Sequence, residues 1–338
     1  MNLTMDLLRI MGSPFQDVLI PIDQSEIEPL CEHSAKNRMS FYFMDRIGQG
    51  NLQNLAYLYQ KELKKCNQTY DAITGTSALL RGANIKHGVI KTIRPYKSTT
   101  VDIDIVVFGP EVEYEKTIVT LLNAKFEMLG RGPQSTTLQH PTVDIKVDIY
   151  NEIAVSHIVY LDKRELVDFK ATKKLPNGRF VDVLTPEADL ATIVAHSIIK
   201  EHMYTLSEYF TFIHYLKQID VGKFLELVTK SNITIPVRTH ATITALLHKE
   251  AFKIVPTQLM KILDFLGEET LENTRTAQSD LKMPHKYHPL TVIRSLTEIA
   301  KGKRSRDSMA LQMTRMLRPS FTKEFTRMFF EHLIRETY

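Results

Sequence analysis

Cysteine is scarce in this sequence, and long hydrophobic runs are missing. Only Cys31 and Cys66 occur among 338 residues, too far apart for a disulfide framework or a zinc-binding spacing. This scarcity favours a reducing compartment, and we expect the cytoplasm. The longest apolar run, 190–199, contains His196 and Ser197 and is shorter than the ~20 residues of a membrane-spanning helix. The first residues lack a basic segment, so we expect no secretory signal.

A large excess of charge of one sign is also lacking, since the chain has 43 basic and 39 acidic residues. The excess is nevertheless uneven, because residues 301–338 hold nine basic and four acidic side chains. Four of these cations, Lys301, Lys303, Arg304 and Arg306, occur within six residues that read as a flexible connection between helices. Such a segment indicates a polyanionic partner such as RNA, or else a solvated helix surface.

The order of patterns along the chain predicts an α+β fold with a mixed sheet. Residues 1–66 read as a helical lead, 67–185 as an α/β core, and 186–338 as an all-helical C-terminal domain. A helix is expected over 111–129, ending at Gly130. The expected strands lie at 70–74, 99–108, 142–150 and 155–161, followed by a hairpin formed by 168–172 and 179–184.

The segment Thr100-Val-Asp-Ile-Asp places Asp102 and Asp104 on the same face of a strand, because side chains alternate along a strand. Two carboxylates this close repel each other unless a cation lies between them. The flanking residues are apolar and β-branched, which indicates a buried strand. A divalent metal would account for the two acids. The other interpretation is an edge strand whose polar face is solvated.

A second strand, 142–150, alternates in the same way, with Asp144, Lys146 and Asp148 on one face. If it lies beside the first strand, Asp148 can join Asp102 and Asp104 as a third ligand. Asp148 is preferred to Asp144 because it lies deeper in the apolar run, whereas Asp144 can pair with Lys146. A half-exposed strand with a ladder of charges remains the alternative.

The segment Gly75-Thr76-Ser77 follows the expected strand at 70–74 and precedes a short helical segment. Glycine permits close approach of a ligand, and free N–H groups at a helix start bind phosphate. We therefore expect a phosphate-binding turn here, although the same residues are also typical of a simple turn and N-cap.

The order and spacing of these three segments resemble the polymerase-β-like nucleotidyltransferase superfamily over roughly residues 70–200. Within it, the pattern is most similar to the abortive-infection type toxin nucleotidyltransferases. The shared motifs are Arg81-Gly82, Thr100-Val101-Asp102-Ile103-Asp104, Lys146-Val147-Asp148 and Pro186-Glu187. Those toxins carry a lysine early in the helix after Pro-Glu, where this chain has none before Lys200; His196 and Lys200, one helical turn apart, can substitute for it.

The resemblance implies transfer of a nucleotide from an NTP to an acceptor hydroxyl. Mg²⁺ or Mn²⁺ would be held by Asp102, Asp104 and Asp148, and the phosphates by Gly75, Thr76, Ser77, Lys146 and Lys200. The basic segment favours an RNA acceptor, tRNA-like, and the toxin pattern suggests an antitoxin partner. A protein-modifying transferase or a non-catalytic binding module on the same fold are the alternatives.

Overall fold

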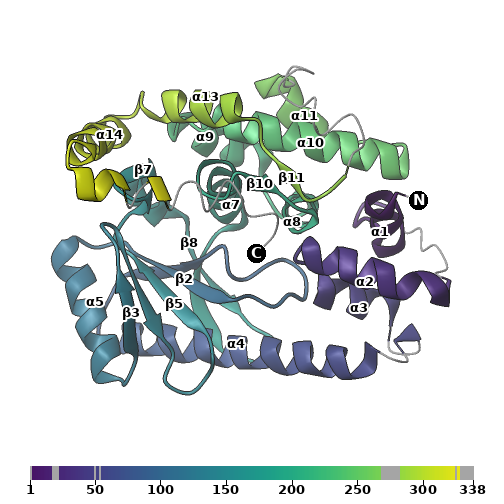
Figure 1. The fold of residues 1–338 in the computed structure, drawn as a ribbon, viewed down its shortest axis with the longest axis horizontal. Coiled ribbons are helices and arrows are strands. Elements are labelled where there is room, and N and C mark those ends of the chain that lie inside the picture. Colours follow the sequence, from purple (N-terminus) through teal and green to yellow (C-terminus); the bar gives the residue numbers. More distant parts are fainter. Residues whose placement is uncertain are drawn as a thin grey trace.

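A seven-stranded sheet with helices on both faces organises the molecule (Figure 1). The computed structural model describes residues 2–16, 23–48, 51–52, 55–267, 282–323 and 326–327. Helices α4 (Ala56–Gly82) and α5 (Glu111–Asn123) pack on one face, and α7 (Pro186–Ile199) lies towards the other. The predicted α+β class is confirmed. Among the described helices, none is long and apolar enough to cross a bilayer.

The sheet is mixed, with strand order β3-β4-β5-β2-β1-β9-β8. Strand β2 pairs in parallel with β5 and antiparallel with β1, so it lies near the middle of the sheet. A separate hairpin is formed by β6 and β7. The bounds are β1 His87–Ile90, β2 Asp102–Val107, β3 Glu127–Arg131, β4 Ser135–Gln139, β5 Lys146–Tyr150, β6 Ile153–Val155, β7 Ile158–Leu161, β8 Lys170–Lys174 and β9 Phe180–Leu184.

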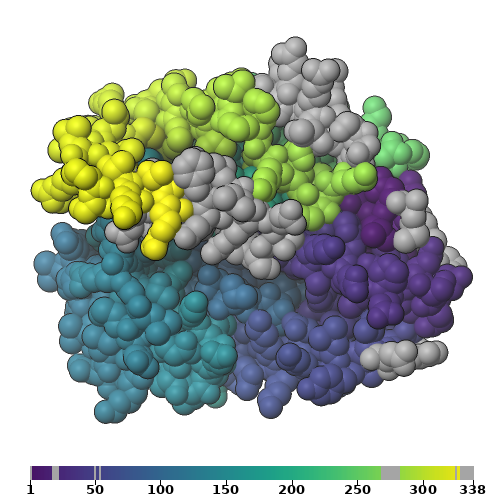
Figure 2. Space-filling view, in the orientation of Figure 1, coloured from purple at the N-terminus to yellow at the C-terminus, as the bar shows by residue number. Residues whose placement is uncertain are grey.

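Helices precede and follow this sheet, as the sequence predicts. Figure 2 shows the C-terminal half along the top and the sheet-bearing part below it. The remaining elements are α1 Leu3–Met11, η1 Gln24–Glu26, α2 Ile27–Lys36, α3 Ser40–Ile47, α6 Lys163–Leu166, η4 Val167–Phe169, α8 Leu206–Tyr215, α9 Val221–Lys230, α10 Thr234–Phe252, α11 Thr257–Leu266, α13 Pro289–Ile299 and α14 Lys303–Met316. The expectation that 186–338 is all helical is wrong in one respect, because two short paired strands occur there, β10 Met203–Tyr204 and β11 His285–Lys286. Residues 268–281 and 328–338 of the predicted helical domain lie outside the described residues.

The alternation in β2 separates two environments. Ile103, Ile105 and Val107 are fully buried against α4 and α5, in one hydrophobic cluster. Val106, on the opposite face, belongs to the larger cluster that contains α7 and α8. Asp102 and Asp104 share that second face, so the acids point towards the helical half of the molecule and away from α4.

The expected strand at 70–74 and the turn at Gly75-Thr76-Ser77 are wrong. These residues lie inside α4, a continuous helix of 27 residues. Ala72, Ile73 and Leu80 lie on its buried face and pack against the sheet. This burial outweighs the low helix propensity of glycine and threonine, because tertiary packing supplies most of the stability of a helix. Helix α4 also passes through the predicted boundary between residues 66 and 67.

Four other elements differ from expectation. Helix α5 ends at Asn123 rather than 129, and Gly130 lies in β3 instead of ending a helix. Strands β1, β3 and β4 were not predicted; the five residues of β3 are all exposed at the sheet edge, so they carry little hydrophobic signal. The hairpin of β8 and β9 is confirmed, and Gly178 adopts φ +79° in its turn, a conformation that favours glycine.

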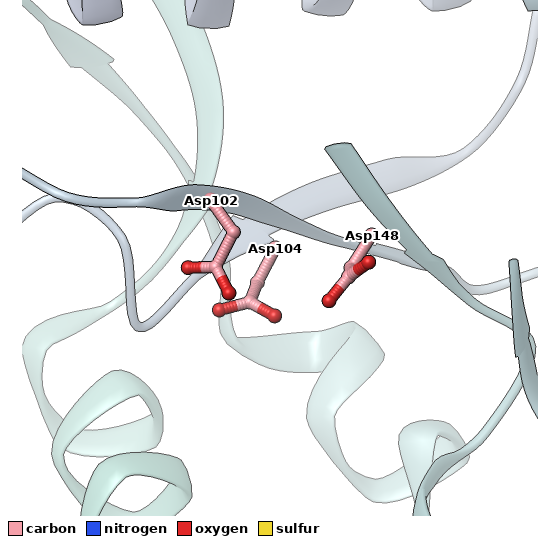
Figure 3. Close-up of side chains that lie close together, drawn as sticks. All are labelled: Asp102, Asp104 and Asp148. Carbon is pink, nitrogen blue, oxygen red and sulfur yellow. The ribbon is translucent and has the colours of Figure 1, made fainter. Parts of the chain in front are cut away.

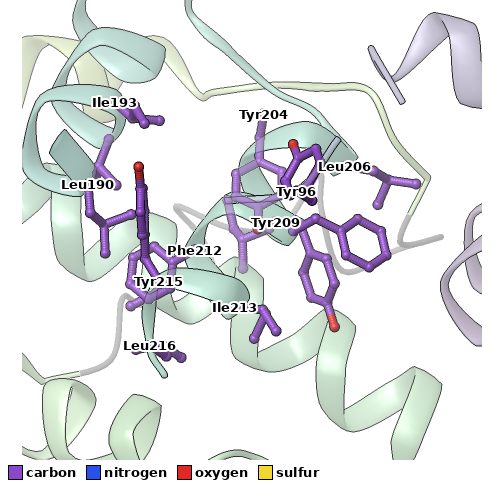
Figure 4. Close-up of a cluster of buried hydrophobic side chains, with 14 of the residues drawn as sticks. Tyr96, Leu190, Ile193, Tyr204, Leu206, Tyr209, Phe212, Ile213, Tyr215 and Leu216 are labelled. Atoms are coloured by element: carbon purple, nitrogen blue, oxygen red, sulfur yellow. The ribbon is translucent and has the colours of Figure 1, made fainter. Parts of the chain in front are cut away.

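An aromatic cluster fixes the long segment between β1 and β2 to the helical half (Figure 4). Tyr96, from that segment, is buried among side chains of α7 and α8. Its hydroxyl lies 3.0 Å from Ser207 Oγ and 3.2 Å from Thr211 Oγ1, both on α8. This anchor holds residues 91–101 against α8, next to the start of β2.

Candidate functional site

Three carboxylates meet on the helical side of the sheet. Asp102 and Asp104 come from β2 and Asp148 from β5, and their side chains point towards one another (Figure 3). One carboxylate oxygen of each residue lies within 4.8 Å of the others. The structure therefore brings together the three acids that the sequence predicts. Asp144 lies before β5 and is exposed, outside this cluster.

The register of the parallel strands produces this convergence. Asp104 is the direct neighbour of Asp148 across the pair, and Asp102 is the neighbour of Lys146. Thr137 on β4 donates a hydrogen bond of 2.5 Å to Asp148 Oδ1. The backbone N–H of Asp104 donates to Thr92 Oγ1 at 2.9 Å. Thr137 therefore holds the Asp148 carboxylate directly, whereas Thr92 holds the backbone of Asp104.

Burial and mutual repulsion set the protonation of the cluster. Burial, with a contribution from the Asp104 charge, raises the pKa of Asp102 to about 6. Burial likewise raises the pKa of Asp148. For Asp104 burial also acts to raise the pKa, but Lys91, His196, Lys200 and a hydrogen bond from Tyr150 together outweigh it, so the pKa is lowered. Asp104 is therefore the carboxylate of the cluster that is most firmly ionised.

Lys91 is a further candidate site residue, and it is not among those that the sequence predicts. It follows β1 directly, and its Nζ lies 3.3 Å from Asp104 Oδ1 and 5.0 Å from the centre of the Tyr150 ring. Its backbone has φ +57°, which is uncommon outside glycine, and its N–H donates to Asp189 Oδ1 at 2.7 Å. Such a conformation persists only where the surroundings impose it, and it is frequent at functional sites. A lysine directly after a short buried strand is the signal that sequence reading could have used.

A chain of polar side chains continues from Lys91. Its Nζ lies 3.3 Å from Nδ1 of His196, and Nε2 of His196 lies 3.0 Å from Glu201 Oε1. Tyr160 Oη is 2.9 Å from the same Nδ1. Burial, together with the Lys91 charge, lowers the pKa of His196 to about 3, so its imidazole is neutral at physiological pH.

The two other lysines that the sequence predicts differ in position. Lys200 ends α7 beside the cluster, and its Nζ lies 5.9 Å from the centre of the Tyr150 ring. Lys146 begins β5 next to Asp102 and is exposed. Both therefore lie on the side of the acids, with Lys200 on the helical wall and Lys146 at the start of a strand.

Two of the three acids open into a cavity of about 360 Å³ between the segment 91–101 and helices α3, α4, α7 and α8. Asp102 and Asp104 lie in its wall, and its size is within the ~300–1,000 Å³ typical of ligand sites. Its basic lining residues are Arg38, Lys65, Lys91, Arg94, Lys97 and Lys200. An acidic patch surrounded by cations suits a ligand that carries both a bound cation and phosphate groups.

Gly75, Thr76 and Ser77 are not part of this arrangement. Thr76 Oγ1 donates to Ala72 O of its own helix at 2.8 Å, and Ser77 Oγ lies 2.8 Å from His87 Nε2. Thr76 and Ser77 are fully buried on the face of the sheet opposite the acids. The free N–H groups on which the phosphate prediction depended do not exist in mid-helix.

The basic segment also differs from expectation. It is not a loop throughout, because α14 begins at Lys303 and includes Arg304 and Arg306. Arg304 Nη2 lies 2.5 Å from Oε1 of Glu152, a carboxylate whose side chain is 6% exposed. Lys301, Lys303 and Arg306 are exposed. Arg304 therefore attaches α14 to the core, which leaves the other three to form any basic surface.

The donor set fits a divalent cation. Carboxylate oxygens are the ligands that Mg²⁺ and Mn²⁺ prefer, and three within 4.8 Å of one another can share one ion. Without a cation, Asp102 and Asp148 are half-buried like charges beside the buried Asp104, and their raised pKa values reflect that cost. The side chains present therefore match the cation that the sequence predicts.

Comparisons with known proteins concern the overall fold. No known protein family matches the chain, and no curated protein matches its sequence. It is similar to a solved structure, an antigenic nucleotidyltransferase-like protein from Paracoccidioides brasiliensis, at 14% identity and a TM-score of 0.29. The similarity covers 62% of this chain and 90% of that one. At this level the neighbour carries no argument about what the acidic cluster does.

Proposed function

We propose that the protein is a metal-dependent nucleotidyltransferase that moves a nucleotide from an NTP to an acceptor hydroxyl. The convergence of Asp102, Asp104 and Asp148, two of which line a cavity that also contains several cations, supports this proposal most strongly. The three acids would hold Mg²⁺ or Mn²⁺. When bound, the metal supplies positive charge that neutralises phosphate oxygens and acidifies the acceptor hydroxyl.

The chain's own residues would bind and orient the substrate. Lys200 and Arg38 lie in the cavity wall and can hold phosphate oxygens. Thr137 keeps the Asp148 carboxylate in place through its 2.5 Å hydrogen bond. In the reaction the acceptor oxygen forms a bond to the α-phosphorus, the bond from that phosphorus to the pyrophosphate oxygen breaks, and pyrophosphate leaves.

RNA, tRNA-like, is the acceptor that we propose. The support is the exposed Lys301, Lys303 and Arg306 at the start of α14, within a C-terminal region of net positive charge. The resemblance to abortive-infection toxins further suggests that the activity is harmful to its host cell and is held in check by an antitoxin. These two features rest on charge and sequence pattern, whereas the reaction type rests on the geometry of the acids.

The test is incubation of the purified protein with each labelled NTP, total RNA and Mg²⁺ or Mn²⁺. We expect label from at least one NTP to appear in RNA, and to disappear with EDTA or in Asp102→Asn. Label found in protein rather than in RNA would indicate that the acceptor is a protein. Absence of transfer with every NTP and both metals, from protein whose fold is intact, would instead support a non-catalytic binding module.

A further inference from the structure

A cation of the protein's own already occupies part of the acidic site. Lys91 Nζ is 3.3 Å from Asp104 Oδ1, and the Lys91 side chain is 6% exposed. Removal of an ammonium from water is costly unless hydrogen bonds or a paired carboxylate compensate for the lost hydration. Lys91 thus neutralises one of the three acids by direct contact, on the side that faces the cavity.

His196 contacts this ammonium as a second partner, in addition to Asp104. Glu201 is a carboxylate and can only accept, so His196 Nε2 carries the hydrogen in their 3.0 Å bond. Nδ1 is then an acceptor, at 3.3 Å from Lys91 Nζ and 2.9 Å from Tyr160 Oη. The pKa of Glu201 is lowered to about 2, because the hydrogen bond from His196 and nearby positive charges outweigh its burial. Glu201 therefore remains the ionised acceptor that sets the tautomer.

We propose that Lys91 is a resident counter-ion that a divalent cation must displace from Asp104 when it binds the acidic cluster. This inference rests on the cation site of the proposed function. Before binding, Lys91 lowers the repulsion among the three carboxylates. During binding, the ammonium and the incoming ion compete for Asp104 Oδ1 and repel each other. His196 keeps the displaced ammonium nearby, in the wall of the cavity.

The proposal predicts opposite changes in two quantities, the stability of the metal-free protein and its affinity for metal. A lysine with only a structural role would not raise one while lowering the other. Removing the Lys91 charge should lower stability without metal, because the carboxylates lose their counter-ion. It should also tighten metal binding, because the competitor is gone. One nearby positive charge lowers the affinity of a site for a second cation by about tenfold or more. A structural role alone predicts lower stability with equal or weaker metal binding.

The experiment measures Mn²⁺ binding by calorimetry, without nucleotide, for wild type, Lys91→Met and Lys163→Met. Lys163 is a matched control: it is 5% exposed, and its Nζ donates to uncharged oxygens of Gly109 and Asn151. We expect Lys91→Met to bind Mn²⁺ about tenfold more tightly and to melt at a lower temperature without metal. Lys163→Met should melt lower with unchanged Mn²⁺ affinity.

A second pair of variants keeps the test decisive. If Lys91→Met does not fold by circular dichroism, Lys91→Gln retains a donor without the charge and is measured instead. In metal-free protein, adding Asp104→Asn to the Lys91 variant should raise its melting temperature, because the unpaired acid is removed. Mn²⁺ binding by wild type with equal or weaker binding by the Lys91 variant would overturn the counter-ion role alone. Failure of both proteins to bind Mn²⁺ would overturn the cation site and this inference together.

Discussion

Asp104 and Asp148 are direct neighbours on the parallel strands β2 and β5, with their carboxylates on the same face of the sheet. Adjacent strands lie about 4.8 Å apart, and like charges placed opposite each other destabilise a sheet. Thr137 binds one of these acids and Lys91 the other. Such a pair, with Asp102 beside it, is unfavourable unless a cation compensates for its charge, and the proposed metal site would supply that cation.

The first prediction concerns the third acid. Asp148→Asn should lower nucleotide transfer at least about 100-fold, because metal binding contributes several kcal/mol to the transition state. Without metal, its free energy of unfolding should be equal to or above that of wild type, since repulsion is relieved. Asp144→Asn is the control, because Asp144 lies just before the same strand and is exposed. This substitution should leave transfer unchanged. Wild-type transfer rates in Asp148→Asn would contradict the three-carboxylate site.

The second prediction compares the two lysines expected to bind phosphate. Lys200→Met should weaken NTP binding about tenfold, because a hydrogen bond to a charged group contributes about 1.5–3 kcal/mol. Lys146→Met should weaken it less than about threefold, since the exposed charge is screened by solvent. Calorimetry with a non-hydrolysable NTP measures both. A larger loss in Lys146→Met would place the phosphates at the start of β5 instead.

The third prediction follows from the position of Ser77 inside α4. Ser77→Ala should leave NTP affinity unchanged and lower the free energy of unfolding by about 1–3 kcal/mol, because the buried His87 Nε2 loses its partner. Urea unfolding and calorimetry on the same preparation measure the two effects. Weaker NTP binding at unchanged stability would restore the phosphate-binding interpretation of Gly75-Thr76-Ser77.

The fourth prediction concerns acid stability. Burial lowers the pKa of His240 to about 3 and that of His214 to about 4, against an ordinary 6.5. The unfolded chain therefore binds more protons than the folded protein below pH 6.5, and stability is lost as the pH falls from about 6.5 towards 4. Urea unfolding at pH 7.5, 6.0 and 5.0 should show this decline. His240→Gln should make the decline shallower; an identical slope would exclude His240 as a source.

The fifth prediction distinguishes the cations of α14. Neutralising Lys303 and Arg306 should weaken RNA binding and flatten the dependence of log affinity on log salt by about 0.7 per contact with a single strand. Arg304→Ala should instead lower stability, because the buried Glu152 carboxylate loses its ion pair. Filter binding at several salt concentrations and thermal unfolding measure these effects. An unchanged salt slope in the double variant would make this surface ordinary solvated helix.

The sequence alone determined that Asp102 and Asp104 share one face of a strand, because side chains alternate with a two-residue period whatever the rest of the chain does. The strict alternation in 142–150 likewise predicted the face of Asp148. That the two strands are neighbours was only a hypothesis, and the register in the structure confirms it. The helical lead, the β8–β9 hairpin and the start of α7 were also local signals, carried by periodicity, turn residues and a proline at a helix start.

Tertiary structure decided what local pattern could not. Gly75-Thr76-Ser77 has the composition of a turn, yet burial of the α4 face against the sheet makes it helix. Lys91, His196 and Glu201 are up to 110 residues apart in the sequence, and only the packing of α7 over the sheet joins them. Arg304 looks like any cation of the basic segment until its contact with Glu152 is seen. Contacts between distant segments depend on how the whole chain packs, so no local pattern in the sequence indicates them.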